Sequence, residues 1–145
     1  MKQLLILLAT VCLAQGVQAQ KEQKVSFSNK VKIDNARIET RQRNNHAYKF
    51  VSVASLKNGQ NYLTLSSGNT LYMEVNAGKL QTLTLAKSNG IQAGRISIRT
   101  GAMNFSCSGP LCACRGDVDC NDMFTTGVCG DAICVDDVCI CVRNR

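Results

Sequence analysis

The sequence predicts an all-β fold: an antiparallel β meander, closing as a small sandwich or barrel, followed by a disulfide-rich, loop-dominated module. Short apolar runs with period-2 alternation recur through the middle of the chain, and turn-forming residues separate them. All cysteines after residue 12 lie within the last 39 residues. A sustained helical pattern of apolar residues does not occur after residue 20. These patterns exclude a helical bundle and a polytopic membrane protein.

The N-terminal segment, residues 1–19, has the organisation of a secretory signal peptide. Lys2 supplies the positive charge, residues 4–14 form an apolar run of 11 residues, and residues 17–19 provide a cleavage site. The apolar run is too short to cross a hydrocarbon core of about 30 Å. We therefore expect cleavage before Gln20, a mature chain without a membrane span, and a secreted, extracellular location, or a periplasmic one if the source is bacterial.

Residues 20–106 are predicted to form a basic antiparallel β domain. In chain order, the strand signals occur at residues 25–27, 31–33, 51–53, 63–65, 71–75, 83–85 and 96–98. The turn signals are Asn58-Gly59, residues 67–69, Ala77-Gly78, Asn89-Gly90 and Gly101. Asn-Gly favours the positive φ angles that a type I′ hairpin turn needs. A spacing of roughly ten residues between turns indicates a meander.

Residues 107–145 are predicted to form a disulfide-rich module. Its eight cysteines are Cys107, Cys112, Cys114, Cys120, Cys129, Cys134, Cys139 and Cys141. An even number in an oxidising compartment predicts four disulfides, while about a hundred pairings remain open. The alternative is a zinc site, which typically uses Cys-x2-Cys pairs and often histidine. The close pairs here are Cys-x-Cys, and the segment has no histidine, so disulfides are favoured.

Charge divides the chain near its only proline, Pro110. Residues 20–106 carry 13 Lys and Arg against four acids, a net charge of +9, whereas residues 107–145 carry three Arg against six Asp, a net charge of −3. The opposite charges leave open whether the acidic module docks on the basic domain.

The densest basic group consists of Arg37, Arg41, Arg43 and Lys49. A basic face on a secreted domain indicates a polyanionic partner, such as an anionic glycan, a phospholipid surface or nucleic acid, because such binding is driven by counterion release. The alternative is a solvated face that serves solubility.

Residues Arg115, Gly116 and Asp117 form an Arg-Gly-Asp tripeptide, a candidate for integrin-type recognition by an extracellular protein. The same segment offers candidate calcium ligands, since carboxylate and amide oxygens recur at Asp117, Asp119, Asn121 and Asp122. An EF-hand is excluded, because Asp122 occupies the glycine position and Val128 the glutamate position. The structural alternative is that these side chains cap turns. Beyond calcium, the sequence predicts no cofactor.

The cysteine spacing from Cys114 to Cys141 resembles that of small secreted modules such as whey-acidic-protein, EB and EGF-like domains. The adjacent cysteines of the whey-acidic-protein type are absent, and no cysteine follows Cys141 as an EGF-like unit requires. The resemblance implies a disulfide-knotted binding module and no specific activity.

Catalytic residue patterns are sparse. His46 is the only histidine, and the carboxylates Asp34, Glu39 and Glu74 are scattered. The sequence therefore predicts a secreted binding or interaction protein, not an enzyme, that presents a disulfide-stapled module on a basic β domain. The alternatives are a secreted effector, either a protease inhibitor or an antimicrobial protein, and an enzyme centred on His46. The oligomeric state and the partner stay open.

Overall fold

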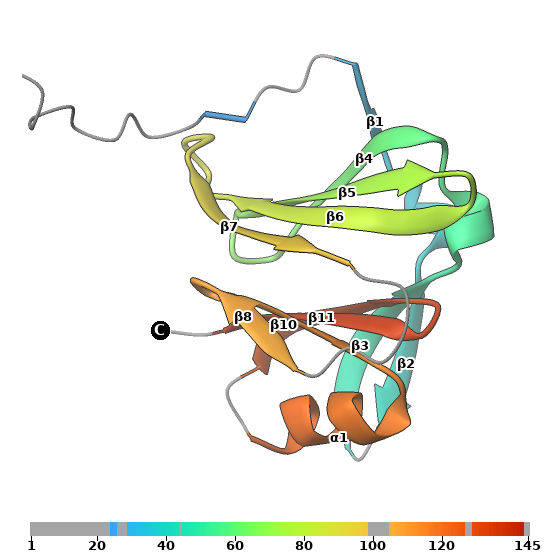
Figure 1. The fold of residues 1–145 in the computed structure, drawn as a ribbon, viewed down its shortest axis with the longest axis vertical. Helices are drawn as coiled ribbons and strands as arrows, with labels where there is room; N and C mark the ends of the chain where they lie inside the picture. Colours follow the sequence, from blue (N-terminus) through green and yellow to red (C-terminus); the bar gives the residue numbers. More distant parts are fainter. Residues whose placement is uncertain (1–23, 26–28, 44, 99–104, 127–128, 144–145) are drawn as a thin grey trace, which may run out of the picture.

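The computed structural model describes residues 24–25, 29–43, 45–98, 105–126 and 129–143, so the predicted signal peptide lies outside the described residues. Within these residues the chain forms two β-sheets that face each other, and one α-helix packs against the far side of the second sheet (Figure 1). The predicted all-β class is confirmed. No helix in the described part of the chain is long and apolar enough to span a bilayer.

The first sheet has five strands. In spatial order they are β1 (Lys30–Lys32), β4 (Gly59–Thr64), β5 (Thr70–Asn76), β6 (Lys79–Ala86) and β7 (Gln92–Ser97). Strands β4 to β7 form the predicted antiparallel meander, whereas β1 runs parallel to β4. Ala77 and Gly78 join β5 to β6 with φ angles of 52° and 74°, which matches a type I′ turn. Asn58-Gly59 closes no hairpin, because the strands on either side of it belong to different sheets.

The second sheet has six strands. In spatial order they are β2 (Glu39–Arg43), β3 (His46–Val51), β10 (Cys129–Val135), β11 (Val138–Arg143), β9 (Leu111–Arg115) and β8 (Ser106–Ser108). All neighbours are antiparallel except β3 and β10, which run parallel. The first two strands come from the predicted basic domain and the other four from the cysteine-rich segment. Strand pairing therefore crosses the boundary that charge suggests between residues 106 and 107.

The cysteine-rich segment differs from the loop-dominated module expected from the sequence. It contains strands β9, β10 and β11, all but the first residue of β8, and the helix α1 (Asp117–Thr125). In β9 and β11 each cysteine alternates with an apolar residue, and cysteine behaves as a small apolar side chain on a strand. The buried residues of α1 are Cys120, Met123 and Phe124, a single i, i+3, i+4 set that is too short for a visible stripe in the sequence.

The alternation in β9 and β11 sorts the side chains of the second sheet onto two buried faces. Leu111, Ala113, Val138, Ile140 and Val142 face the first sheet and join its apolar core. The cysteines face the other way, where they form a second cluster with residues of α1. Strands β9 and β11 are therefore covered on both sides, which accounts for the lack of polar residues in them before their terminal arginines.

The four predicted disulfides are present. They join Cys107 to Cys112, Cys114 to Cys120, Cys129 to Cys141 and Cys134 to Cys139. Two of the bridges connect residues that are direct register partners, in the β8–β9 and β10–β11 hairpins. The Cys114–Cys120 bridge ties α1 to β9. The bridges thus reinforce the sheet and its helix.

A single core between the sheets unites both halves of the chain. Leu71 and Leu83 of the first sheet and Leu111 and Ile140 of the second belong to the same buried cluster. At the β7–β8 side the sheets approach closely at Gly94, where a Cβ atom would overlap the carbonyl oxygen of Ser108. The cysteine-rich segment therefore docks on the basic half by sharing its core.

Candidate functional site

The predicted basic group does not form one surface. Arg41 Nη2 lies 2.9 Å from a Glu39 carboxylate oxygen, and its guanidinium stacks 3.6 Å from the ring centroid of Phe50. Arg43 pairs with Asp117 at 3.0 Å. Lys49 is the register partner of Thr40 and so lies on the opposite face of the β2–β3 hairpin from Arg41. Arg37 lies apart, in a short 3-10 turn (Asn35–Arg37).

The Arg-Gly-Asp tripeptide spans the junction between β9 and α1. Arg115 ends β9, Gly116 caps the helix with a φ of 84°, and Asp117 is the first residue of α1. The Arg115 Nε lies 3.6 Å from a carboxylate oxygen of Asp137, whereas Asp117 pairs with Arg43. The two charges therefore engage different partners, and integrin-type recognition stays a prediction.

The candidate calcium ligands lie along α1. Asp117, Asn121 and Asp122 line an open hollow together with Arg43, whereas Asp119 is not part of its lining. The guanidinium of Arg43 occupies the position beside Asp117 that a cation would need. The calcium site stays a prediction, with Arg43 as its competitor.

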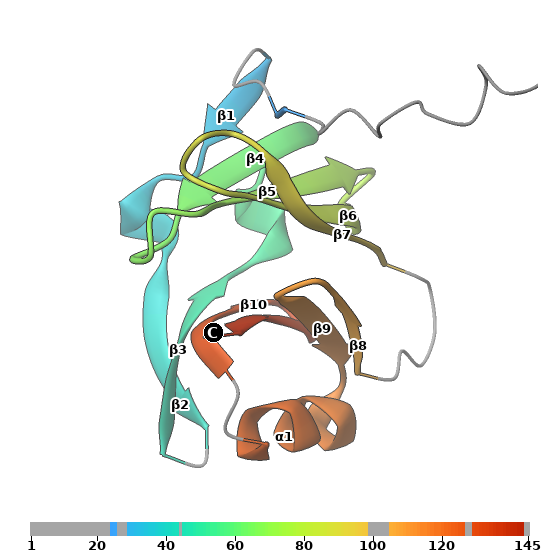
Figure 2. The ribbon, with the colours of Figure 1, turned by 90° about the vertical axis from the view of Figure 1, so that its left-hand side faces the viewer.

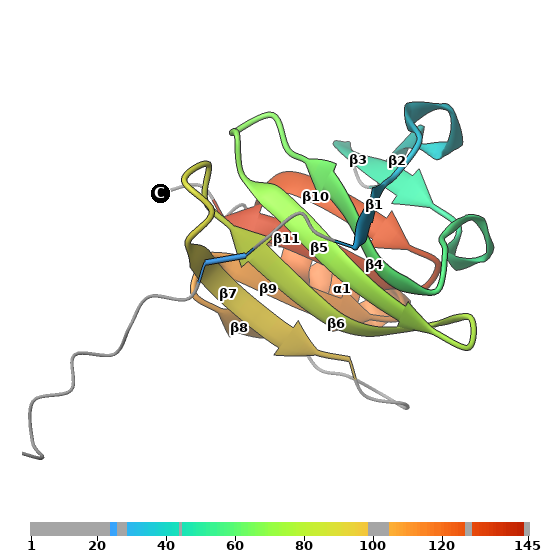
Figure 3. The same cartoon turned by 90° about the horizontal axis from the view of Figure 1, so that it is seen from above.

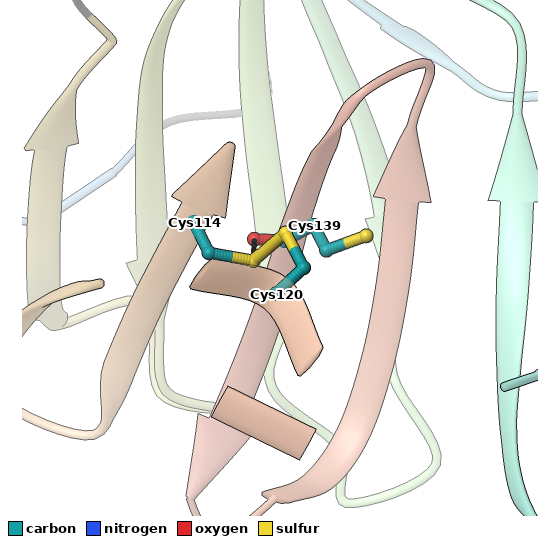
Figure 4. Close-up of side chains that lie close together, drawn as sticks. All are labelled: Cys114, Cys120 and Cys139. Atoms are coloured by element: carbon teal, nitrogen blue, oxygen red, sulfur yellow. Dashed lines mark hydrogen bonds between the residues drawn. A yellow bond between two sulfur atoms is a disulfide. The ribbon is translucent and has the colours of Figure 1, made fainter. Parts of the chain in front are cut away.

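The cysteine sulfurs beneath α1 form the one cluster with metal-ligand proximity among the described residues. The Sγ atoms of Cys114, Cys120 and Cys139 lie within 4.8 Å of one another (Figure 4). Cys114 and Cys120 are bonded to each other and Cys139 is bonded to Cys134, so no thiolate is left to bind a metal. The 3.5 Å approach of the Cys114 sulfur to the Cys139 carbonyl oxygen is a packing contact, since an oxidised sulfur has no proton to donate.

His46 begins β3 in the β2–β3 hairpin, which forms one edge of the second sheet and reaches the level of α1 (Figure 2). Its ring stacks against Phe124, with the centroids 6.4 Å apart, and Tyr48 approaches the same ring at 5.8 Å. These aromatic contacts anchor the hairpin to the helix. An enzymatic role for His46 stays untested.

A different surface, the outer face of the first sheet, brings together chemistry that sequence reasoning missed. Figure 3 looks directly onto this face. Strand register places two rows of mostly polar side chains across it, one running Lys30, Gln60, Glu74, Thr82 and Ser97, the other Lys32, Tyr62, Tyr72, Thr84 and Arg95. Along each strand, alternate side chains point outward, and these residues are the outward ones. The second sheet covers only the side chains that point inward.

A hollow of about 240 Å³ lies on this outer face; we call it the basic hollow. Its cationic lining residues are Lys24, Lys30 and Arg95, and its polar ones are Gln60, Tyr72, Thr82, Thr84 and Gln92, with Val25 completing the wall. No carboxylate is among these lining residues. The one acid in the two rows, Glu74, accepts a 3.3 Å hydrogen bond from the side-chain amide of Gln60.

Residues distant in sequence meet at the basic hollow. Lys24 is placed by a bridge to Ile91 and by the 2.8 Å hydrogen bond from the Val25 amide to the Gly90 carbonyl. The Lys30 ammonium lies 4.5 Å from the ring centroid of Tyr72, a cation–π contact. Arg95 comes from β7. The sequence marks the outward positions, but it does not say which strands are neighbours.

Burial changes the proton affinities of two groups in this hollow. Burial lowers the pKa of Lys30, because desolvation disfavours the ammonium ion. Burial, and to a lesser degree Tyr62, raises the pKa of Tyr72. Tyr72 as a residue is 2% exposed, and its ring centroid lies 5.9 Å from that of Tyr62. A bound anion would offset the desolvation of Lys30, so the hollow suits negative charge.

Comparisons with protein-family models, curated proteins and solved structures found no match to this chain.

Proposed function

We propose that this protein is an extracellular binding protein, not an enzyme, and that its basic hollow holds an anionic glycan. The observation that carries the proposal is the convergence of Lys24, Lys30 and Arg95 around a hollow without a lining carboxylate. Three cations attract sulfate or carboxylate groups, and counterion release strengthens that attraction.

The remaining lining residues favour a saccharide over a bare anion. Thr82, Thr84, Gln60 and Gln92 present hydroxyl and amide groups that both donate and accept hydrogen bonds, as sugar hydroxyls require. Tyr62 is half-buried and is the register partner of Tyr72, which lines the hollow. An aromatic surface beside polar groups is suited to the apolar face of a sugar.

The location and the rigidity of the chain support the same proposal. The predicted signal peptide and the four disulfides indicate an oxidising, extracellular compartment. The bridges also rigidify the second sheet, on which the first sheet packs. A face that is ordered before its ligand arrives loses less conformational entropy on binding. Recognition of an extracellular protein by residues 107–145, protease inhibition and antimicrobial action remain predictions from the sequence alone.

Two variants with equal loss of charge test the proposal. One replaces Lys24, Lys30 and Arg95 by Gln; the control replaces Arg37, Lys49 and Lys57 by Gln. We expect the first to lower the affinity for a short heparin oligosaccharide about tenfold or more, and the control to lower it much less. Calorimetry in a series of salt concentrations measures both. Equal losses would mean that net charge alone attracts the ligand, and equally tight binding of inorganic phosphate would reject the saccharide.

A further inference from the structure

Another hollow lies at one end of the sandwich, away from the basic hollow. It opens between the β5–β6 turn and the β10–β11 turn, which lie at the same end of the molecule (Figure 1). Its volume is about 360 Å³, at the lower end of the range of roughly 300–1,000 Å³ that is typical for small-molecule pockets. We call it the end pocket.

The floor of the end pocket is apolar and comes from both sheets. Leu80 and Ile98 belong to the first sheet's side of the core, and Val135 and Val138 to the second sheet. All four are at most 9% exposed. Val53 adds a half-buried aliphatic wall. The pocket therefore opens directly onto the hydrophobic core, and an apolar group placed there would leave water.

The rim of the end pocket carries two cations and two carboxylates. They are Lys79, Arg115, Asp136 and Asp137. One oxygen of Asp136 accepts a 3.2 Å hydrogen bond from the Val53 amide, which holds that carboxylate at the rim. Arg115 Nε and the Asp137 carboxylate are 3.6 Å apart, longer than a charge-assisted hydrogen bond of about 2.7–2.9 Å. The Arg115 Nε atom is itself buried, but the Arg115 and Asp137 side chains as wholes are 22% and 67% exposed, so a ligand can still reach both side chains.

From this arrangement we infer that the end pocket binds a zwitterionic apolar molecule, namely a free aliphatic amino acid. Its aliphatic side chain lies on the floor formed by Leu80, Ile98, Val135 and Val138. Its carboxylate contacts Arg115 and Lys79, and its ammonium group contacts Asp137 and Asp136. The ligand thereby exchanges the long Arg115–Asp137 contact for two shorter charge-assisted ones.

The equal numbers of positive and negative charges at the rim favour an aliphatic amino acid over a fatty acid or an aliphatic amine. A fatty acid would bring a carboxylate close to Asp136 and Asp137 without a compensating cation of its own. An aliphatic amine would meet the same penalty at Lys79 and Arg115. A molecule that carries both charges finds an opposite charge at the rim for each of its own, and mismatched charges discriminate against the other two classes.

The experiment uses the oxidised mature chain and L-leucine as the probe, measured by calorimetry. Glycine lacks the apolar side chain, N-acetyl-leucine lacks the ammonium charge, and leucinamide lacks the carboxylate. We expect leucine to bind and each of the three analogues to bind about tenfold or more weakly. A flat titration with leucine up to about 10 mM overturns the inference, as does equal affinity for leucine and either charge-deleted analogue.

Two variants assign the contacts. Arg115→Gln should weaken the binding of leucine and leave that of leucinamide unchanged, while Asp137→Asn should weaken leucine and leave N-acetyl-leucine unchanged. Lys87→Gln, at the opposite end of the sandwich, is the matched control and should bind leucine as the wild type does. If both analogues lose affinity in both variants, the contacts are wrong as assigned. The comparison of analogues on the wild type remains decisive if a variant does not fold.

This site is separate from the basic hollow. The variant that lacks Lys24, Lys30 and Arg95 should still bind leucine, and Arg115→Gln should still bind heparin. Loss of leucine binding in the triple variant would contradict two independent sites.

Discussion

Arg43 and Asp117, 74 positions apart in the chain, form an ion pair with 3.0 Å between Nη2 and Oδ1. Arg43 ends β2 and Asp117 opens α1, so the pair joins the edge of the second sheet to the helix. The Asp117 side chain is 96% exposed, and exposed pairs contribute little to stability because water screens them. The pair therefore matters chiefly for what Asp117 is able to bind.

We expect Arg43→Gln to strengthen any binding of calcium to the hollow lined by Asp117, Asn121 and Asp122. Removal of the guanidinium leaves the carboxylate oxygens available and takes away a repelling charge. Stability should fall by less than about 1 kcal/mol. Calorimetric titration with calcium is the measurement, and Arg37→Gln, which removes the same charge elsewhere, is the control. Titrations without heat in both the wild type and Arg43→Gln would rule out calcium at this position.

Gly94→Ala should destabilise the protein strongly, by about 3 kcal/mol or more, because overpacking at a backbone contact cannot relax easily. A Cβ atom at this position would overlap the carbonyl oxygen of Ser108, where the two sheets meet. Gly78→Ala is the control: its φ of +74° is strained for alanine, but its surroundings are open, so its cost should stay near 1–2 kcal/mol. Urea denaturation measures both, and a milder effect at Gly94 than at Gly78 would contradict the close approach of the sheets.

A comparison of two disulfides separates two contributions to stability: the chain entropy lost on loop closure and the packing of the bridge. Cys107–Cys112 and Cys114–Cys120 have sequence separations of 5 and 6, so their chain-entropy contributions should be nearly equal. Cys114 and Cys120 are both buried between α1 and β9, however, whereas in the other bridge Cys112 is buried and Cys107 is exposed. We expect the double alanine variant at Cys114 and Cys120 to lose about 1–3 kcal/mol more stability than the variant at Cys107 and Cys112. Urea denaturation compares the variants, and equal losses would show that α1 adds no packing energy.

Tyr72 should keep its proton at a pH where an ordinary tyrosine ionises. Burial, with a smaller contribution from Tyr62, raises its pKa above the usual value of 10.0. Unfolding returns the hydroxyl to that usual pKa. Its contribution to stability is therefore complete below about pH 10 and is lost as the pH rises through the raised pKa of the folded state.

Tyr72→Phe cannot ionise and should lose less stability than the wild type above pH 10. Urea denaturation across alkaline pH tests this, and the ultraviolet absorbance of tyrosinate follows the ionisation directly. Stability curves that run parallel in the two proteins would show that the hydroxyl ionises with equal ease in the folded and the unfolded chain.

Much of the first sheet could be predicted from local patterns. Leu71, Met73 and Val75 alternate with polar residues, and the turn at Ala77-Gly78 follows directly, so β5 and its hairpin are visible in the sequence. The alternation also marks Tyr72, Thr84 and Arg95 as outward residues. Their convergence with Lys24 and Lys30 could not be predicted, because it depends on β1 pairing in parallel with β4 across a long connection.

In the cysteine-rich segment, less of the structure could be predicted from local patterns. Its disulfides were predictable from the number of cysteines and the expected compartment, but their partners were not. The helix α1 was missed, since its three buried residues span one turn and the acidic residues around them are typical of turns.

By itself, the sequence determined the elements that depend on neighbouring residues: the β class, the meander from β4 to β7, its Ala77-Gly78 turn and the oxidised cysteines. Only the tertiary structure decided which strands pair, which cysteines bond, and where the charges of Lys24, Lys30, Arg95 and Arg115 come to lie. The physical reason is the distance along the chain over which each interaction acts. Period-2 alternation and turn preferences act over a few residues, whereas the core that Leu83 and Ile140 share is a property of the whole folded chain.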